Sequence, residues 1–270
     1  MTRRLHLALG LTLVCLIVGA VVLSYLWLPF TPDDTTGGRL TPPGGDHWLG
    51  TDKLGRDLFT QLLIGGRIAL GTALGAVAVG GTLGVLLGLL AGFASRWLDD
   101  AVAVALDILI AFPTLLLAML IVAGFGASLG AAVLAIGLAM AAIVARLTRI
   151  LVKQVLSRDY VTAARISGLS WPRIVLTHVL PNIWPVVLVN LALQAGLAVL
   201  AEASLSYLGL GTPPPNASWG RMLFEAQATV LTAPLAAIAP GLALVALVVG
   251  INLTADGLRD LADPTRRRSR

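Results

Sequence analysis

Six runs of about 20 apolar residues recur along the chain, separated by segments rich in polar residues, glycine and proline. Such a run can cross a bilayer, and it must do so as a helix because lipid offers the backbone no other hydrogen-bond partner. The pattern therefore predicts an all-α membrane protein with six transmembrane helices. The expected spans are Leu5 to Leu28, Ile68 to Ala94, Ala101 to Gly124, Ser128 to Leu151, Pro181 to Leu208 and Leu231 to Leu253.

The first run has some features of a secretory signal, since Arg3 and Arg4 form a basic start. However, residues 24–29, Ser-Tyr-Leu-Trp-Leu-Pro, do not form a small-residue cleavage site. The run is also longer than the apolar core of a usual signal peptide. A retained transmembrane helix within residues 1–29 is therefore favoured.

The composition agrees with lipid as the solvent. Hydrophobic residues make up 57% of the chain and charged residues 12%, whereas a soluble domain is about 25% charged. Glycine is abundant, with 29 residues, which suits helices that pack closely in a membrane. The single cysteine, Cys15, allows no intrachain disulfide, and the three histidines are too scattered to predict a metal site.

The lysine and arginine residues predict the orientation, because cytoplasmic loops are enriched in them. With the N-terminus inside, 14 of the 19 basic residues lie on the cytoplasmic side and five lie outside. We therefore expect a multi-pass protein of a prokaryotic inner membrane with both termini in the cytoplasm. The net charge of +5 follows from this distribution, so nucleic acid is not an expected partner. The outer five are Arg39, Lys53, Arg56, Arg67 and Arg221.

The cytoplasmic segment 152–180 is too long to be a simple connector. Residues 158–168 predict a short amphipathic helix ended by Gly168. Ser170 and Pro172 then indicate the start of a second helix. Two small helices would form a compact knob on the cytoplasmic face. Its Ala-Ala pair offers little side-chain bulk, so another protein could approach it closely.

The same loop resembles the EAA loop of ABC importer permeases, whose pattern is Glu-Ala-Ala, three residues, Gly, nine residues, then Ile, any residue, Leu-Pro. Ala163-Ala164, Gly168 and Leu180-Pro181 keep that spacing. Thr162 stands in place of the glutamate and His178 in place of the isoleucine, so no acidic contact is expected at Thr162. The resemblance implies that the loop docks into a cleft of an ATP-hydrolysing subunit and transmits its motion. An ordinary amphipathic surface helix is the alternative. The expected coupling residues are Tyr160, Thr162, Ala163, Ala164, Arg165, Gly168, Pro172, Leu180 and Pro181.

Further motifs follow in the order typical of one family. The outer segment contains His47 to Asp57 and then Gly66 to Leu70. Later motifs are Asp107 to Pro113, Glu202 to Gly211, Pro213-Pro214, Ser218 to Gly220, Asp256 to Asp260 and Asp263-Pro264. Nearly the whole chain thus resembles the dipeptide, oligopeptide and nickel permease family, second-subunit type, with the ABC importer type I permease fold.

The outer motif carries a set of turn-forming and charged residues. Arg56 lies between Asp52 and Asp57 and can pair with either carboxylate. The leucines at 54, 58, 62 and 63 fall on one helical face and predict a helix lying at the membrane interface. A self-packed outer cap and direct substrate contact both remain open. The candidate residues here are Gly50, Thr51, Asp52, Gly55, Arg56, Asp57 and Arg67.

Two features of the second and third runs concern the membrane interior. Gly84, Gly88 and Gly92 recur every four residues and predict a seam for close helix packing rather than a pathway. Asp107 lies about two turns into the third run, where a carboxylate is costly unless paired, protonated or wet. It is therefore either a pathway residue or a structural partner of an arginine such as Arg96. Pro113 should kink this run.

Polar residues in the fifth run share one helical face. Asn190, Gln194 and Glu202 are separated by four and eight residues. That face is expected either to line the solute route or to pack against a partner subunit. Glu202 is expected near the outer end, facing solvent.

The sequence has no ATP site of the P-loop type, because neither Lys53 nor Lys153 follows the required glycine-rich run. No catalytic set is visible either, so an enzyme is not expected. The family resemblance implies a heterodimer with a homologous permease, two cytoplasmic ATP-binding domains that hold ATP and Mg²⁺, and an extracytoplasmic solute-binding protein. No cofactor or metal is expected in this chain.

The expected function is ATP-driven import of di- and oligopeptides. The alternatives are import of nickel or another metal chelate, an ion-coupled secondary transporter, and a membrane-embedded enzyme. The expected parts are an N-terminal transmembrane helix (1–29), an extracytoplasmic segment with an interfacial helix (30–67), a permease core (68–256) and a basic cytoplasmic tail (257–270). The core includes the coupling loop (152–180) and an outer loop (209–230).

Overall fold

The computed structural model describes residues 2–213 and 216–262. Pro214 of one motif, the Asp263-Pro264 motif and most of the expected basic tail therefore lie outside the described residues. The helices are α1 (Thr2–Leu26), α2 (Leu58–Phe93), α3 (Arg96–Ala111), α4 (Thr114–Phe125), α5 (Leu129–Leu156), α6 (Asp159–Ile166), α7 (Trp171–Ile174), a π-helix (Val175–Val179), α8 (Leu180–Tyr207), α9 (Trp219–Ala226) and α10 (Leu235–Ala262).

The prediction of an all-α membrane protein is confirmed. Within the described residues, α1, α2, α5, α8 and α10 are long and apolar enough to cross a membrane. α3 and α4, which are bent by 87° at a short break, make a sixth if the pair is counted as one span.

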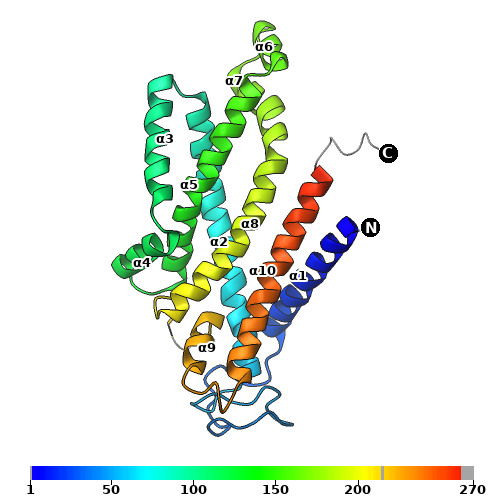
Figure 1. Ribbon diagram of the computed structural model, residues 1–270, viewed down its shortest axis with the longest axis vertical. Coiled ribbons are helices and arrows are strands. Elements are labelled where there is room, and N and C mark those ends of the chain that lie inside the picture. Colours follow the sequence, from blue (N-terminus) through cyan, green and yellow to red (C-terminus); the bar gives the residue numbers. More distant parts are fainter. Residues whose placement is uncertain (1, 214–215, 263–270) are drawn as a thin grey trace.

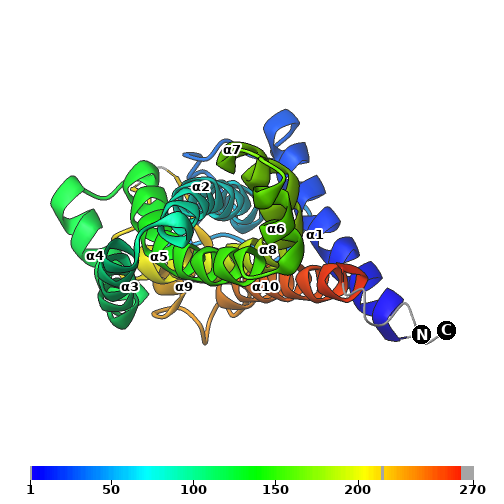
Figure 2. The same cartoon turned by 90° about the horizontal axis from the view of Figure 1, so that it is seen from above.

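The helices form an elongated bundle (Figure 1). In the view from above, α2, α5 and α8 occupy the middle, α1 and α10 lie at one edge, and α3 and α4 lie at the opposite edge (Figure 2). The short helices α6 and α7 lie at one end of the bundle; α10 ends in the same half, and α1 starts at about mid-height (Figure 1). Following the orientation predicted from the basic residues, we call the end with α6 and α7 the cytoplasmic end. The non-helical segment 28–57 and α9 lie at the other, outer end.

The glycine stripe of α2 is the packing seam that its spacing predicts. A Cβ atom at Gly84 would lie 2.6 Å from Cβ of Val144, and one at Gly88 would lie 2.5 Å from Cβ of Thr148. Gly80 and Gly92 meet α5 in the same way. Since only hydrogen occupies these positions, the backbones of α2 and α5 approach closely along most of their length.

The expected interfacial helix in the outer segment is wrong. α2 begins at Leu58, ten residues earlier than Ile68, and continues without a break to Phe93. The reason is the Asp57 cap, whose carboxylate accepts the backbone N–H of Thr60 at 2.7 Å. Leu58 and Leu63 consequently lie in the first two turns of a spanning helix and are buried, whereas Leu54 is exposed in the preceding loop.

Two other expected spans also differ. The third is broken rather than merely kinked, because Pro113 lacks a backbone N–H and keeps Phe112 in an extended conformation, with ψ of 130°. The last begins at Leu235 instead of Leu231, which is 96% exposed in the preceding turn. α10 continues to Ala262, so the described start of the expected tail is helical.

Candidate functional site

The cytoplasmic knob is built from α6, α7 and the π-helix. α6 ends in a Schellman motif, in which the N–H of Gly168 donates to the carbonyl of Arg165 at 3.0 Å and that of Leu169 to the carbonyl of Ala164 at 3.1 Å. This motif needs a residue in the left-handed region at Gly168, whose φ is +84°. Glycine adopts that conformation without the steric cost of a Cβ atom.

The knob is anchored by its apolar face. Val161 of α6, Ile174 of α7 and Val179 of the π-helix are fully buried in a cluster with Val152 of α5 and Ile183 of α8. Val161 and Ile174 therefore hold the small helices on two spanning helices. The opposite face is open, because most of the predicted coupling residues are exposed and two are half-buried. The exposed ones are Tyr160, Thr162, Ala163, Arg165, Gly168, Pro172 and Pro181, and the half-buried ones are Ala164 and Leu180.

Aromatic contacts extend the knob to α2. The guanidinium carbon of Arg165 lies 4.4 Å from the centre of the Trp171 ring. Trp171 in turn meets Phe93, the last residue of α2, edge-on with ring centres 5.3 Å apart. Tyr160 meets His178 with ring centres 6.0 Å apart. Displacement of α6 would therefore be felt by α2 as well as by α5 and α8.

The outer motif folds around its two aspartates. Asp52 accepts the backbone N–H groups of Leu54 at 2.7 Å and Arg56 at 2.9 Å. Its second oxygen accepts Nε of Arg56 at 2.7 Å. Asp57 caps α2 and also contacts Nδ1 of His47 at 3.0 Å. Of the two partners predicted as possible for Arg56, the structure pairs it with Asp52.

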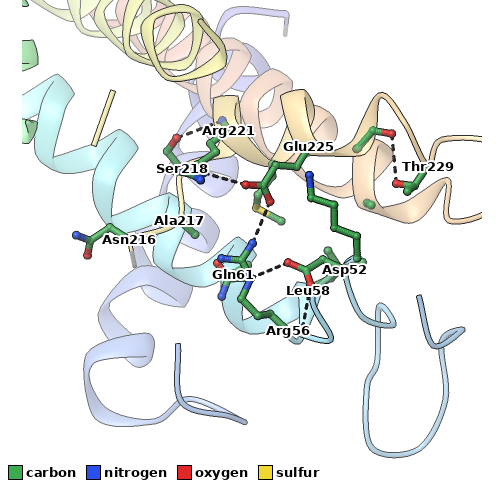
Figure 3. Close-up of a pocket in the computed structure, with 14 residues that line it drawn as sticks. Asp52, Arg56, Leu58, Gln61, Asn216, Ala217, Ser218, Arg221, Glu225 and Thr229 are labelled. Atoms are coloured by element: carbon green, nitrogen blue, oxygen red, sulfur yellow. Dashed lines mark hydrogen bonds and ion pairs between the residues drawn. The ribbon is translucent and has the colours of Figure 1, made fainter. Parts of the chain in front are cut away.

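Arg56 also joins the outer segment to α9 (Figure 3). Its Nη2 lies 2.9 Å from Oε2 of Glu225, while Oε1 of Glu225 lies 2.9 Å from Nε of Arg221. We call Asp52, Arg56, Arg221 and Glu225 the outer clamp. A small cavity of about 30 Å³ adjoins it. Sequence reasoning missed Glu225, although its four-residue spacing from Arg221 is typical of a helical ion pair.

The remaining outer residues stabilise backbone turns and hold helices together at the outer end of the bundle. Gly50 and Gly55 have φ values of +82° and +86°, and each faces backbone atoms where a side chain would collide. Thr51 is buried and donates its hydroxyl to the Gly38 carbonyl at 2.7 Å. Arg67 holds α1 to α2, since its Nε donates to Ser24 Oγ at 2.7 Å and its guanidinium stacks on Tyr25.

Two ion-pair sites join α3 to α5. The sequence predicted an ion pair for one of them, at Asp107, but named Arg96 as the example of a partner. Asp107 lies 3.2 Å from Arg146 rather than near Arg96, and its side chain is 57% exposed. Asp99, which sequence reasoning missed, is buried at the start of α3. Its carboxylate lies 2.5 Å from Nε of Arg149 and also binds the Lys153 ammonium.

The polar face predicted for the fifth span is only partly assembled. Glu202 is 1% exposed, so the expectation that it faces solvent is wrong. Its Oε1 accepts the Ser206 hydroxyl at 2.6 Å, while its Oε2 has no hydrogen-bond partner among the described residues. Gln194 is 4% exposed and borders a separate cavity formed with α4 and α5. Asn190 is half-buried, and its Oδ1 is also without a described partner.

The family model for the binding-protein-dependent transport system inner membrane component matches residues 84–268. The chain belongs to this family. It is therefore a permease of a binding-protein-dependent ABC importer, located in the inner membrane, and such a system has ATPase and binding-protein components besides the permease. The family lacks an ATPase site and cofactors, and no cluster of three or more potential metal ligands occurs in the described part of this permease. The alternatives of an ion-coupled secondary transporter and a membrane enzyme are thereby wrong.

Similar permeases cover most of the chain. The dipeptide transport system permease protein DppC of Alkalihalophilus pseudofirmus is 39% identical over 84% of this permease and 74% of its own length. The glutathione transport system permease protein GsiD of Pectobacterium atrosepticum is 38% identical over 97% of this permease and 87% of its own length. The nickel transport system permease protein NikC of Escherichia coli K12 is 36% identical, over 98% and 96% respectively.

Proposed function

We propose that this permease pairs with a homologous permease to import short peptides, and that two cytoplasmic ATP-binding domains drive it through α6. The observation that carries the proposal is the form of the knob. Its buried side is fixed to α5 and α8 by Val161 and Ile174, and its open side presents the Ala-Ala pair and Gly168. A rigid part with one free face is suited to receive a force from another protein.

The coupling proposal follows from these contacts. Closure of the ATP-binding domains would displace α6, and the Arg165–Trp171–Phe93 contacts would carry that displacement to the end of α2. Because α2 and α5 pack along a glycine seam, they would move as one unit. ATP would thus favour one of two arrangements of the bundle by binding it more tightly.

The outer clamp supports a structural role for the outer motif. Asp52 and Asp57 have their oxygens occupied within the chain, and Glu225 is shared between Arg56 and Arg221. We read the motif as a self-packed cap that gives a binding protein a firm surface to dock on, and not as a direct contact for the solute.

Peptides are the favoured cargo because relatives that are similar over most of the chain are named for dipeptide and glutathione transport. Nickel import is the second candidate, and it has support from the nickel transport relative. In both cases we propose that the solute passes between two permeases. A cavity between α4, α5 and α8 on this chain includes Leu197 in its lining, and Leu197 is 58% exposed.

The test is reconstitution of the complete importer in proteoliposomes with its binding protein. We expect ATP-dependent accumulation of radiolabelled dialanine that excess Ni²⁺ does not inhibit. Accumulation of ⁶³Ni²⁺ in place of dialanine would overturn the peptide assignment. A photoreactive benzoylphenylalanine at Ala163 should cross-link to an ATP-binding domain, and the same residue at exposed Leu208 on the outer end should not. Absence of the first cross-link would contradict the coupling role.

A further inference from the structure

We propose that the cavity between α4, α5 and α8 is a station on the solute route, where the Gln194 carboxamide hydrogen-bonds an amide group of a passing peptide. The inference rests on the proposed function. The cavity measures about 220 Å³. Its walls combine the start of α4, the middle of α5 and the C-terminal half of α8.

Gln194 is the buried polar side chain that this cavity leaves unused, beside the exposed Thr114 at its rim. It lies at the middle of α8 and is 4% exposed, and its side chain makes no hydrogen bond to any described residue. Ser204 borders the same cavity, but its hydroxyl already donates to the Leu200 carbonyl at 2.8 Å. A carboxamide without protein partners in a cavity gains hydrogen bonds when a ligand supplies them. Its donors and acceptor are therefore available to a ligand that arrives and leaves.

The lining defines the chemistry of that ligand. None of the described residues that border the cavity is charged, and Ile136, Met140 and Leu197 give it apolar walls. A carboxamide offers both donors and an acceptor, which complements the N–H and C=O of a peptide unit. A bare cation would find no carboxylate or imidazole there. The cavity is smaller than the ~300–1,000 Å³ usual for a whole ligand, so it would hold one residue of the solute.

The position of the cavity also suits a transient site. Its α4 wall, at Thr114 and Leu115, directly follows the break at Pro113. Since α3 and α4 are already bent by 87° there, movement at this break would change the wall without disturbing the α2–α5 seam. A few uncharged hydrogen-bonding groups among apolar side chains bind weakly enough to release the solute again.

The experiment compares Gln194→Leu with Ser204→Ala in the reconstituted importer. We expect Gln194→Leu to lower the maximal rate of dialanine uptake at least ten-fold, while basal ATP hydrolysis and assembly stay within two-fold of the unsubstituted complex. Ser204→Ala should leave uptake within two-fold, because its hydroxyl is bonded to its own helix. Gln194→Asn, which keeps the amide, should recover part of the rate. Uptake by Gln194→Leu within two-fold of the unsubstituted complex would overturn the inference, as would an equal loss of uptake and ATP hydrolysis.

A second measurement tests directly whether the solute reaches the cavity. Benzoylphenylalanine at Leu197, which borders the cavity, should form an adduct with tritiated dialanine during turnover, and Gln194→Leu should reduce that adduct. Adducts with lipid or with the second permease alone would contradict a solute site. If the unsubstituted importer takes up no dialanine, the proposed peptide function fails and this inference fails with it. If it does take up dialanine but forms no adduct, only the inference fails.

Discussion

Arg56 and Glu225 stand 169 residues apart in the sequence, and their side chains meet at 2.9 Å at the outer end of the bundle. The side chains are 15% and 17% exposed, so this pair is shielded from solvent more than most surface ion pairs. The contact joins the loop before α2 to the helix after α8. The outer cap is thereby one unit, although α2, the α3–α4 pair, α5 and α8 separate its halves along the chain.

Removal of one member of this pair should loosen the cap. We expect Arg56→Ala to destabilise it by about 1.5–3 kcal/mol, the range for a hydrogen bond to a charged group. Limited proteolysis of segment 30–57 in the purified complex measures this as faster cleavage. Arg221→Ala is the control, because Arg221 contacts the same carboxylate at 34% exposure and such a helical pair contributes about 0.3–0.5 kcal/mol. Equal cleavage rates for the two variants would count against the clamp.

Gly168 and Gly209 form a natural matched pair. Both end a helix in a Schellman motif, their φ values are +84° and +80°, and a Cβ at either would meet nothing within 4 Å. Aspartate at either position should cost about 1–2 kcal/mol through the left-handed backbone. Only Gly168→Asp should also raise the number of ATP molecules hydrolysed per solute imported, because only Gly168 lies on the knob. A normal ratio for Gly168→Asp would refute its coupling role.

Alanine substitutions at two glycines of α2, one inside the glycine seam and one outside it, should have opposite effects on stability. Gly88→Ala should destabilise the protein by about 1–3 kcal/mol, because its Cβ would lie 2.5 Å from Thr148 and 2.6 Å from the Ala145 carbonyl oxygen. Gly71→Ala should be neutral or stabilising by up to about 1 kcal/mol, since nothing lies within 4 Å and alanine favours a helix. Thermal unfolding of the purified complex in detergent distinguishes them. A lower melting temperature for Gly71→Ala would be unexpected.

The two α3–α5 ion-pair sites should respond differently to neutralisation. Asp99→Asn leaves Arg149 and Lys153 facing each other without a carboxylate, and since both cations are partly exposed the loss should cost about 1.5–3 kcal/mol, the range for a hydrogen bond to a charged group. Asp107→Asn removes a pair whose members are more than half exposed, which is worth at most about 1 kcal/mol. Expression level and thermal unfolding measure both effects. A loss of uptake by Asp107→Asn at unchanged stability would instead favour the pathway role of Asp107.

The residues of the cytoplasmic knob and of the outer clamp could be predicted only where they are neighbours in the chain. The spacing from Ala163 to Pro181 predicts the knob, because a short helix, its glycine end and the next helix are local features. Glu225 and Phe93 could not be assigned in this way, since their partners Arg56 and Trp171 come from distant segments. Glu202 was expected to face solvent because helical periodicity gives a face but not what covers that face.

The sequence by itself determined the number of apolar runs, their orientation through the basic residues, the Gly84–Gly92 seam and the coupling-loop pattern. Each of these depends on a local period or a charge count, which a single chain displays directly. Only the tertiary structure decided that Asp57 starts α2 early and that Pro113 breaks a span. It also decided that Gln194 and not Glu202 borders the cavity. The first two outcomes rest on local features, the Asp57 cap and the missing N–H of Pro113, whose strength the pattern alone does not reveal. The last depends on which helices meet, and close packing between distant segments sets that arrangement.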